Sequence, residues 1–437
     1  MSAANGLKIW HPFTQAHADP GPLQIVSAQG VYLHTADGRR IIDAISSWWV
    51  NLHGHCHPRL VAAVAAQVGS LDHVLLAGFS HPKVEQLTRK LQGIVPSSLQ
   101  HIFYSDDGST AVEVALKLAV QYWQNRGLTE KRGLIALDHA YHGDTSGAMS
   151  VSADSGFTGP FASFRFPVHR VPSAYCLRCP VGKKRDTCQI DCVEPLRELL
   201  ANRSGEVAAV IVEPLLQGAG GMIVHPVEFL QRVRDLCTAH DVLLIADEVL
   251  TGFGRCGKMF ACDLAGVVPD LMCLSKGITG GILPLGATLC TENIYQEFTG
   301  PGRSFFHGHS YTGNPVICAA AVANLEIFET EDVFGRIKQI AVHHQKRLHR
   351  LSSHPNVEET RQIGAIAAIE LKADDPGYFS NLKPRLYKFF LDHGVLLRPL
   401  GNVIYILPPY VITGKELDYV YDVIEEGIAI AFAQTPL

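Results

Sequence analysis

The sequence predicts an α/β protein, with a large, mostly parallel sheet that carries helices on both faces and a smaller α+β domain built from the chain ends. Between about residue 100 and residue 330, short runs rich in Val, Ile and Leu alternate with longer segments of helical period. After residue 331 the order becomes helix, strands and helix, which suits a separate small lobe. The chain has 437 residues, 47% of them apolar, which is enough for a core of this size.

The large domain is expected to alternate strands with helices. The expected strands are residues 101–105, 133–137, 207–212, 242–246, 271–274 and 284–290. The expected helices include residues 110–125, 227–240 and 315–329. The first of these helices has a single apolar stripe, which indicates a face that packs on the sheet; the stripe is formed by Ala111, Ala115, Leu118, Ala119 and Tyr122.

The two ends of the chain are expected to pack together beside the large domain. After residue 331 we expect helices 333–351, 383–393 and 415–428 and strands 364–371, 395–397 and 403–407. Before residue 60 we expect a strand around 30–34 and a segment, 45–57, that is dense in Trp and His. The predicted parts are an N-terminal segment 1–60, a large domain 61–330 with a Cys-containing insertion near 172–195, and a small domain 331–437. An active cleft is expected at their junction.

Composition argues against nucleic-acid and membrane partners. The chain has 37 Lys and Arg against 42 Asp and Glu, so no global positive field attracts phosphate backbones. No stretch approaches the roughly 20 apolar residues of a membrane-spanning helix, and residues 1–10 show neither a signal peptide nor a transit helix. Eleven cysteines, an odd number in a chain this long, indicate mostly free thiols in a reducing compartment. We therefore expect a cytoplasmic protein.

An anion site is expected where the strand 101–105 ends. Asp107-Gly108-Ser109-Thr110 begins a helix there. The free backbone N–H groups and the positive dipole end of a helix N-terminus favour a phosphate. An ordinary helix cap is the simpler interpretation when this turn is taken alone.

Three more side chains follow neighbouring strands. Asp247 follows the run 242–246, at the edge where open α/β sheets bind ligands. Lys276 follows the run 271–274, where burial lowers a lysine's pKa and favours Schiff-base formation. Tyr141 follows the run 133–137 and offers a flat ring to the same cleft. Taken alone, the pair Asp247-Glu248 could hold a metal, cap a helix or pair with a cationic ring nitrogen. A surface lysine and a core or surface tyrosine are the simpler interpretations of the other two.

Taken together, the four features match what a pyridoxal phosphate site needs. A lysine holds the aldehyde, an acid keeps the pyridine nitrogen protonated, a helix terminus takes the phosphate, and an aromatic ring covers one face of the cofactor. Four such features at strand ends are much less expected by chance than one, so the joint interpretation is favoured over four separate ones.

These positions make the chain similar to a known family. The sequence resembles the class III, fold type I pyridoxal-phosphate aminotransferases over essentially its whole length. The matching stretches are Trp10-His11-Pro12-Phe13-Thr14, Ser46-Ser47-Trp48-Trp49, Asp107-Gly108-Ser109, Tyr141-His142-Gly143-Asp144-Thr145, Glu213-Pro214, Gln217-Gly218-Ala219, Ala246-Asp247-Glu248-Val249, Thr251-Gly252-Phe253-Gly254-Arg255, Lys276-Gly277, His307-Gly308 and Arg398-Pro399. The Trp pair together with Trp10-His11-Pro12 is fairly specific to the branch that serves biotin synthesis.

The resemblance implies roles for individual residues. The catalytic residues it implies are Lys276, which would carry the cofactor as a Schiff base, Asp247 at the pyridine nitrogen, and Tyr141. Gly108 and Ser109 would bind the phosphate, together with His309 and Ser310 from a second subunit, so a homodimer with shared active sites is implied. The residues implied to contact substrate are Phe13, Trp48, Trp49, Tyr141, Gly308 and Arg398.

The resemblance to the biotin branch also implies the substrates. The acceptor would be 8-amino-7-oxononanoate, converted to 7,8-diaminononanoate, with a ping-pong exchange of the amino group. A long keto acid needs an apolar wall, which Trp48 and Trp49 would supply, and a guanidinium for its carboxylate, which Arg398 would supply. The amino donor is S-adenosylmethionine, as the Trp pair suggests, or lysine, as residues 305–314 suggest. Phe13 replaces a tyrosine of the best-known members, which removes one polar contact.

Two other interpretations stay open. Another class III ω-amino acid or diamine aminotransferase would share the lysine, the acid and the phosphate site, but should lack the Trp wall. A metal-organised binding protein would use the cysteine loop instead and would carry no pyridoxal phosphate.

The cysteine loop itself has three interpretations. Cys176, Cys179, Cys188 and Cys192 have the spacing C-x2-C-x8-C-x3-C, which allows a structural zinc site, disulfides or free thiols. No metal is expected in the reaction. His53, His55 and His57 alternate along the chain, but polar packing near the Trp pair explains them better than a metal site.

Overall fold

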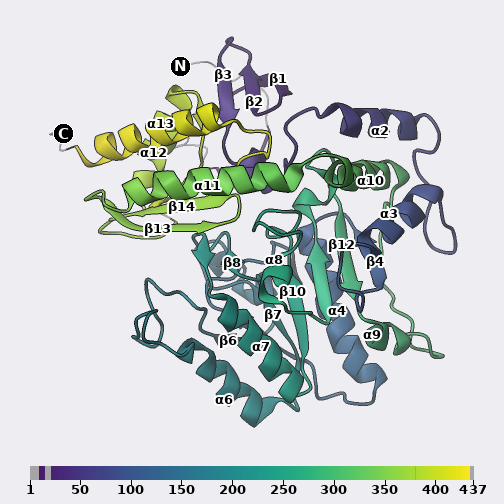
Figure 1. The fold of residues 1–437 in the computed structure, drawn as a ribbon. Coiled ribbons are helices and arrows are strands. Elements are labelled where there is room, and N and C mark those ends of the chain that lie inside the picture. Colours follow the sequence, from purple (N-terminus) through teal and green to yellow (C-terminus); the bar gives the residue numbers. More distant parts are fainter. Residues whose placement is uncertain (1–8, 15–20, 379, 434–437) are drawn as a thin grey trace.

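The computed structural model describes residues 9–14, 21–378 and 380–433. The expectation that residues 1–10 contain no leader therefore lies mostly outside the described residues. Within the described ranges, no helix combines the length and the low polarity needed to cross a membrane. Figure 1 shows the large sheet in the lower part of the molecule, with the C-terminal helices beside the N-terminal strands above it.

A seven-stranded sheet forms the centre of the large domain. Its strands are β4 (His101–Ser105), β5 (Gly133–Leu137), β6 (His169–Val171), β7 (Val207–Val212), β10 (Leu243–Asp247), β11 (Leu271–Leu274) and β12 (Gly286–Cys290). Their spatial order is β4-β12-β11-β10-β7-β5-β6. The pairings are parallel except those of β12, which runs antiparallel to both β11 and β4. The predicted mostly parallel sheet is confirmed, and the six expected strands are present with small shifts at their ends.

Helices cover both faces of this sheet, as predicted. Along β10, Leu243 and Ile245 lie in one buried cluster with α4 (Gly108–Asn125), whereas Leu244 and Ala246 lie in the other cluster with α7 (Val227–Ala239). Successive residues of a strand point to opposite faces. The continuous apolar sequence of β10 is thus explained by burial on both sides.

The remaining helices of the central region surround this sheet. They are α2 (Pro58–Val68), α3 (Pro82–Gln92), α5 (Ser146–Val151), α6 (Glu194–Arg203), α8 (Ala261–Ala265), α9 (Glu292–Gln296) and α10 (Pro315–Thr330), with the 3-10 helices η1 (Gly159–Phe164), η2 (Asp191–Val193) and η3 (Lys276–Thr279). The expected helices 110–125, 227–240 and 315–329 correspond to α4, α7 and α10. Helix α10 packs against α2, α3 and η3, so it lies directly beside the lysine that follows β11.

The two ends of the chain share one sheet. Strands β1 (Ile25–Gln29), β2 (Tyr32–Thr35) and β3 (Arg40–Asp43) are joined by β15 (Val395–Leu396), in the order β1-β2-β3-β15. The pairing of β15 with β3 is parallel, with Val395 opposite Ile42. Figure 1 shows the purple N-terminal strands next to the yellow C-terminal helices. The ends therefore pack together as expected, while the exact domain boundaries at residues 60 and 330 stay a prediction.

The C-terminal part adds a second small sheet and three helices. Strands β13 (Val357–Ile363), β14 (Ile366–Leu371) and β16 (Val403–Ile406) form an antiparallel sheet in the order β13-β14-β16. The helices are α11 (Val333–Leu351), α12 (Leu382–Asp392) and α13 (Gly414–Phe432). The expected strand 364–371 starts later, at Ile366, because Gly364 turns the chain with a positive φ of 52°. These elements match the predicted α+β composition.

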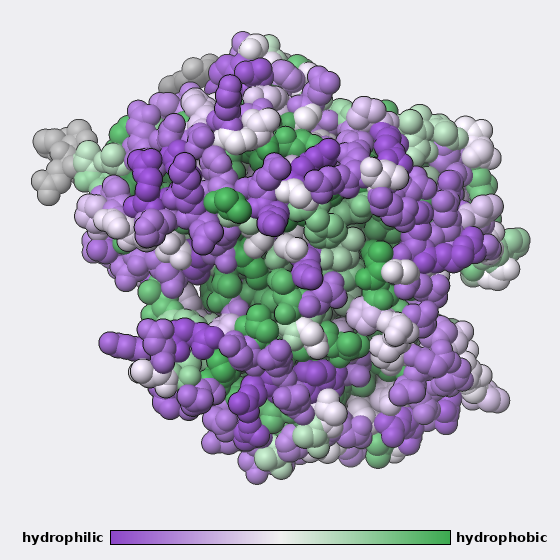
Figure 2. Space-filling model, in the orientation of Figure 1, coloured by the Kyte–Doolittle hydropathy of each residue, from purple (hydrophilic) through white to green (hydrophobic). Residues whose placement is uncertain are grey.

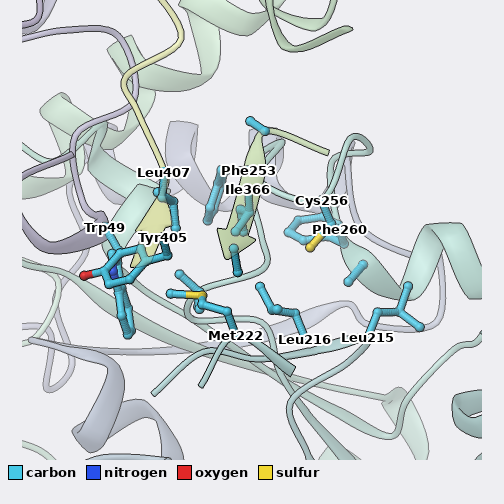
Figure 3. Packing of buried hydrophobic residues seen from close by; sticks show 14 of the residues in the cluster. Trp49, Leu215, Leu216, Met222, Phe253, Cys256, Phe260, Ile366, Tyr405 and Leu407 are labelled. Atoms are coloured by element: carbon cyan, nitrogen blue, oxygen red, sulfur yellow. The ribbon is translucent and has the colours of Figure 1, made fainter. Parts of the chain in front are cut away.

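The core continues from the large domain into the small one. Two short strands, β8 (Leu216–Gln217) and β9 (Ile223–Val224), pair at this boundary. Figure 3 shows Met222 and Leu216 of this hairpin facing Trp49, Tyr405 and Ile366. Figure 2 shows hydrophobic side chains gathered in the recess between the upper and lower parts of a largely hydrophilic face. The junction between the domains is therefore a packed, apolar boundary.

Candidate active site

The carboxyl edge of the central strands brings the predicted acid and lysine together. Asp247 is the last residue of β10, and its register partner on β11 is Cys273, which precedes Lys276 by three residues. The carboxylates of Asp247, Glu213 and Asp107 all lie close enough to act electrostatically on Lys276. The parallel arrangement of β10 and β11 therefore places an ammonium group among acids at one edge of the sheet.

Lys276 is buried enough for its protonation to change. Burial lowers the pKa of Lys276, and the negative charges of Asp247 and Glu213 oppose this shift. Its Nζ lies 5.3 Å from the centre of the Trp49 ring. A lysine with a lowered pKa carries more neutral amine near neutral pH, which is the form that attacks carbonyl carbon.

Asp247 is fixed by a buried histidine. The Nδ1 atom of His142 lies 2.6 Å from Oδ2 of Asp247, and both residues are almost fully buried. The other oxygen, Oδ1, accepts the backbone N–H of Val249 at 3.1 Å. A carboxylate held in this way favours a cation beside it. Sequence reasoning included His142 in the matching stretch, but assigned it no role.

Glu213 organises the turn that carries Tyr141. Its two carboxylate oxygens accept the backbone N–H groups of Tyr141 at 2.9 Å and of Gly218 at 3.0 Å. Burial raises the pKa of Glu213 to about 7, although the nearby His142 opposes the shift. Burial also raises the pKa of Tyr141, and the Asp144 carboxylate adds to it, so the phenol is neutral at physiological pH. Glu213 was another residue that the sequence analysis left without a role.

The predicted anion site is a cup at the N-terminus of α4. Asp107 caps the helix by accepting the Thr110 N–H at 2.8 Å, and the helical N–H groups of Gly108 and Ser109 have no partner inside a helix. The Ser109 hydroxyl lies 2.8 Å from that of Thr145 and accepts the Thr145 N–H at 3.1 Å. The cup is therefore lined by hydroxyl groups as well as by N–H groups.

Two glycines make this cup possible. A Cβ on Gly108 would lie 2.6 Å from Cγ1 of Val249, which follows the Asp247-Glu248 pair. A Cβ on Gly143 would lie 2.2 Å from the Ser109 hydroxyl oxygen. The glycines thus let the segment after β10 and the Tyr141 turn approach α4 closely.

Aromatic rings and one arginine line the other side of the cleft. The Arg398 guanidinium lies 4.6 Å above the Trp48 ring and donates to the backbone oxygen of Phe13 at 2.9 Å. The Phe13 and Trp48 rings meet edge to face at 5.3 Å. Trp48 is partly exposed, whereas Trp49 is 5% exposed and packs on Tyr405. Part of Trp48 therefore stays open to contact, whereas Trp49 belongs to the packed core.

The turn that carries the Trp pair is strained and tightly held. All four residues of α1 (Ser46–Trp49) have positive φ, from 45° to 80°. Asp43 accepts the Ser47 N–H at 2.9 Å and the Ser47 hydroxyl at 2.8 Å. A run of left-handed residues persists only where its surroundings determine it, so the position of Trp48 is fixed by the fold.

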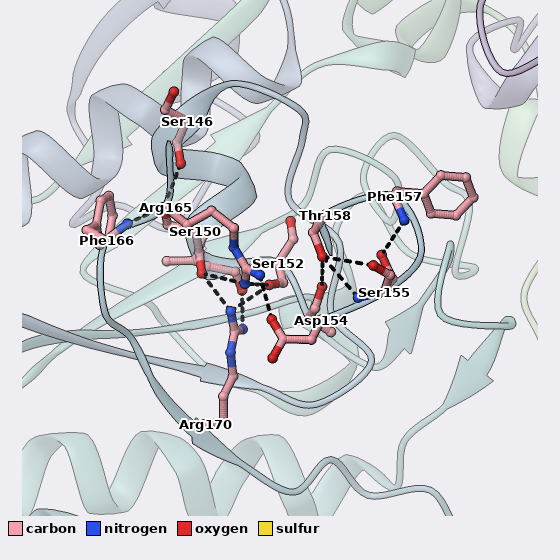
Figure 4. Close-up of polar contacts among 12 residues, drawn as sticks. Ser146, Ser150, Ser152, Asp154, Ser155, Phe157, Thr158, Arg165, Phe166 and Arg170 are labelled. Carbon is pink, nitrogen blue, oxygen red and sulfur yellow. Dashed lines mark hydrogen bonds and ion pairs between the residues drawn. The ribbon is translucent and has the colours of Figure 1, made fainter. Parts of the chain in front are cut away.

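A further phenylalanine, Phe157, completes the aromatic wall. Its ring lies 5.8 Å from Phe13 and 4.6 Å from Tyr378. Figure 4 shows Phe157 on a turn tied by Ser155 and Thr158, beside two arginines that hold the preceding helix. Arg165 and Arg170 both donate to the backbone oxygen of Ser152, at 3.0 and 2.5 Å. Sequence reasoning missed Phe157 because the contact with Phe13 is entirely non-local.

One exposed loop carries three residues that are implied to contact the phosphate or the substrate. Gly308, His309 and Ser310 lie on this exposed loop, and His309 Nε2 lies 3.5 Å from Oδ1 of Asp106 in the same chain. The loop thus borders the α4 cup. The implied contribution of His309 and Ser310 to a second subunit stays a prediction.

The cysteine loop does not provide a metal site in this structure. Cys176, Cys179, Cys188 and Cys192 line one small cavity, and all four are free thiols. Nowhere in the described ranges are three or more His, Cys, Asp or Glu side chains arranged to hold a metal ion. The loop is instead anchored to the small domain by a 2.5 Å ion pair between Arg178 and Glu370.

The three alternating histidines have separate polar partners, as expected for packing. His53 contacts Asn324 at 2.9 Å and His55 contacts Asp43 at 2.8 Å. His57 lies 3.5 Å from Glu331. Their segment is irregular rather than a strand, and the rings of His53 and His57 meet edge to face at 5.9 Å.

Known proteins resemble this chain along nearly its whole length. The family model "Aminotransferase class-III" matches residues 13–428. Adenosylmethionine-8-amino-7-oxononanoate aminotransferase of Geobacter sulfurreducens is 45% identical, over 96% of this chain and 95% of the relative. The protein of the same name from Synechococcus elongatus is 47% identical, over 96% and 97%.

Solved structures agree with these relatives. The adenosylmethionine-8-amino-7-oxononanoate aminotransferase of Methanocaldococcus jannaschii has a TM-score of 0.91 and 38% identity, covering 97% of both chains. An amine transaminase from an uncultivated Pseudomonas species, in a form with bound pyridoxal phosphate, has a TM-score of 0.92 and 33% identity, covering 97% of this chain and 99% of its own. The overall fold is thus shared by enzymes with different substrates.

Proposed function

The chain belongs to the class III aminotransferases, which use pyridoxal phosphate, and from this premise we propose that it transfers an amino group to 8-amino-7-oxononanoate. The product would be 7,8-diaminononanoate, an intermediate of biotin synthesis, and the proposed donor is S-adenosylmethionine. The relatives that carry these substrates in their names support the proposal. The structural observation that carries it is Arg398, stacked on Trp48 within an aromatic wall.

The residues at the sheet edge fit pyridoxal phosphate. The α4 cup offers N–H and hydroxyl donors to a phosphate, and Gly108 and Gly143 keep it open. Asp247, buried and fixed by His142, would hold a proton on the ring nitrogen. When bound, the cofactor supplies an electron sink for the bond broken at the substrate's α-carbon.

Lys276 would then move the proton. Its lowered pKa allows the amine to accept a proton from the substrate and return it to the neighbouring carbon. The Tyr141 turn, whose backbone N–H is held by Glu213, would place its ring near Asp247 in the same region. Since one lysine serves both halves of the exchange, donor and acceptor should follow ping-pong kinetics.

The acceptor's chain and carboxylate suit the far side of the cleft. A nine-carbon keto acid needs apolar contact along its length, which Trp48, Phe13 and Phe157 provide. Its carboxylate needs a planar donor, and Arg398 is already oriented by the ring beneath it and by the Phe13 carbonyl.

The test uses the purified enzyme with pyridoxal phosphate. The enzyme is first converted to its amino form with S-adenosylmethionine, and 8-amino-7-oxononanoate is then added alone. We expect the visible absorption band of the lysine-bound cofactor to return and the diamine to appear by mass spectrometry. A separate lysine arm tests the donor, and activity with lysine but none with S-adenosylmethionine would overturn the donor assignment.

The Lys276→Ala variant is the control for that experiment. It should lose both the visible band and turnover while remaining folded. A variant that keeps both would contradict the role proposed for Lys276. An unchanged enzyme that does not react with 8-amino-7-oxononanoate would contradict the proposed substrate.

We further propose that two copies of the chain form a dimer around the α4 cups. Phe306 is 88% exposed on the loop that carries His309 and Ser310, and Phe79 and Tyr311 are also largely exposed. Large exposed aromatic side chains of this kind mark contact surfaces. The free thiols and the biosynthetic reaction fit work in the cytoplasm.

Subunit complementation tests the sharing of sites. Lys276→Ala and a double variant, His309→Ala with Ser310→Ala, are each inactive or weak alone if the loop serves the partner's site. Mixed dimers should then recover about a quarter to a half of the activity of the same amount of unchanged enzyme, since one of their two sites is intact. No recovery in dimers verified by native mass spectrometry would contradict the shared site.

A further inference from the structure

The backbone of Lys276 is held in an unusual conformation. Its φ is 44°, in the left-handed region that side chains other than glycine rarely adopt. The residue begins η3, a short 3-10 helix with the glycine pair Gly280 and Gly281 just after it. Such a conformation persists only if neighbouring groups determine it, so the loop must have a support outside itself.

Asn324 supplies that support from the middle of α10. Its Nδ2 donates to the backbone oxygens of Gly277 at 3.1 Å and Ile278 at 3.0 Å. These are the two carbonyls that follow Lys276. Asn324 is completely buried within an otherwise apolar stretch of α10. A buried amide in such a place is costly unless its hydrogen bonds are made.

His53 determines which way this amide faces. Its Nε2 lies 2.9 Å from Oδ1 of Asn324, and an amide oxygen can only accept, so Nε2 must donate. Burial lowers the pKa of His53 to about 4, so the ring is neutral with its single proton on Nε2. The charged or titratable groups that face this ring are His57, Glu331, Arg255 and Tyr410. With Oδ1 engaged, the Nδ2 group is directed at the loop carbonyls.

The same pair ties the loop to the turn of the Trp pair. His53 follows the segment Val50–Leu52, whose Leu52 N–H donates to the Gly280 oxygen at 3.2 Å. A Cβ on Gly280 would lie 3.0 Å from Oδ1 of Asn324, and a Cβ on Gly281 would lie 2.6 Å from the Val50 oxygen. The lysine loop and the substrate turn are therefore in close contact at this point.

We propose that Asn324, oriented by His53, is a positioning residue that sets where the Lys276 amine stands. The inference rests on the role of Lys276 proposed above. Asn324 and His53 touch neither substrate nor cofactor in this assignment; they act through the backbone of the loop. Removing them should displace the amine from Asp247 and Glu213, whose charges bear on it.

The experiment compares Asn324→Leu and His53→Leu with the unchanged enzyme. Leucine keeps the branched shape of the asparagine side chain and an apolar bulk at the histidine position, and in both variants it removes the hydrogen bonds. We expect kcat to fall by roughly 5- to 150-fold, the equivalent of one or two lost hydrogen bonds, with KM changed by less than about twofold. The pH midpoint of the visible absorption band should also shift, because it reports the surroundings of the lysine nitrogen. His53→Gln, which can still donate to Asn324, should restore most of both properties.

Asn402→Leu is the matched control. Asn402 is equally buried and also joins backbone groups, donating to the Leu371 oxygen and accepting the Gly377 N–H, but in the small domain. It should cost stability without moving the pH midpoint. If Asn324→Leu fails to fold, the two His53 variants carry the comparison.

The two possible failures are distinguishable. Unchanged kcat and an unchanged pH midpoint in Asn324→Leu or His53→Leu would overturn the positioning role. Absence of a protein-bound visible band in the unchanged enzyme, after unbound pyridoxal phosphate has been removed, would instead overturn the proposed role of Lys276. A midpoint shift that Asn402→Leu reproduces would also overturn the inference, because the effect would then be a general loss of stability.

Discussion

At the residue scale, Arg398 is held by two contacts, the Phe13 carbonyl and the Trp48 ring, and neither is with an acid. Arg398→Gln should raise the KM for 8-amino-7-oxononanoate by roughly 10- to 150-fold, the equivalent of one charge-assisted hydrogen bond pair. Steady-state kinetics with each substrate varied in turn measures this. The exposed Arg385→Gln serves as control, and an unchanged KM would show that the carboxylate is bound elsewhere.

Gly108 permits a second residue-scale prediction. A Cβ there would meet Val249 at 2.6 Å, a distance that packed atoms do not tolerate. Gly108→Ala should therefore weaken cofactor binding, measured by titrating apoenzyme with pyridoxal phosphate. Val249→Ala removes the obstructing methyl groups, so the double variant should recover most of the affinity. A double variant as weak as Gly108→Ala would mean that the glycine is needed for another reason.

The sequence could predict residues at strand ends better than residues inside helices. Asp247 and Lys276 follow apolar runs, and the structure ends β10 and begins η3 at these residues. Their chemical roles remain predictions. Asn324 lies in the middle of α10, where one polar residue in an apolar helix gives no indication of its partner. The only available signal was its polarity within Ala321-Val322-Ala323-Asn324-Leu325.

At the element scale, Glu248 joins the end of β10 to the start of α8. It accepts the N–H groups of Ala261 at 3.0 Å and Cys262 at 2.8 Å. Burial raises the pKa of Glu248 to about 7, although the Thr251 hydroxyl opposes the shift. Because the folded pKa is raised above 4.5, the folded state binds more protons between pH 4.5 and 7, and stability falls as pH rises through this window.

Glu248→Gln should abolish that pH dependence. The difference in free energy of unfolding between this variant and the unchanged enzyme should change with pH. It should shift in favour of the variant by on the order of 3 kcal/mol between about pH 5 and about pH 8. Denaturant unfolding at both pH values measures the difference, and the exposed Glu130→Gln is the control. Parallel pH profiles for the Glu248→Gln variant and the unchanged enzyme would contradict the prediction.

Some strands that depend on distant partners escaped sequence analysis. The central strands are continuous apolar runs and were recognisable on their own, and the strand expected at 395–397 is present as β15. By contrast, β6 has only three residues, and it was missed because it exists only beside β5. Strand β13, whose sequence Val-Glu-Glu-Thr-Arg-Gln-Ile is largely polar, was missed for its composition. Tertiary pairing overrides local propensity in these cases.

At the scale of the whole molecule, Arg255 joins all three regions of the chain. This fully buried guanidinium donates to the backbone oxygens of Trp49 at 3.1 Å, Asn51 at 3.0 Å and Pro408 at 2.9 Å. Arg255→Lys should lower the free energy of unfolding by about 2–4 kcal/mol, because an ammonium cannot reach three separate acceptors. Denaturant unfolding tests this, with the exposed Arg232→Lys as control; equal stability would show that the three segments hold together without it.

The pairing of β3 with β15 also imposes an order on biosynthesis. Strand β3 leaves the ribosome early, whereas its neighbour at Val395–Leu396 is among the last segments translated. A growing chain can complete its central sheet while still tethered, but its N-terminal edge must wait, unpaired, until translation is nearly over. A nascent chain stalled before residue 395 should therefore carry a formed central sheet while the edge of β3 that later receives β15 is still open.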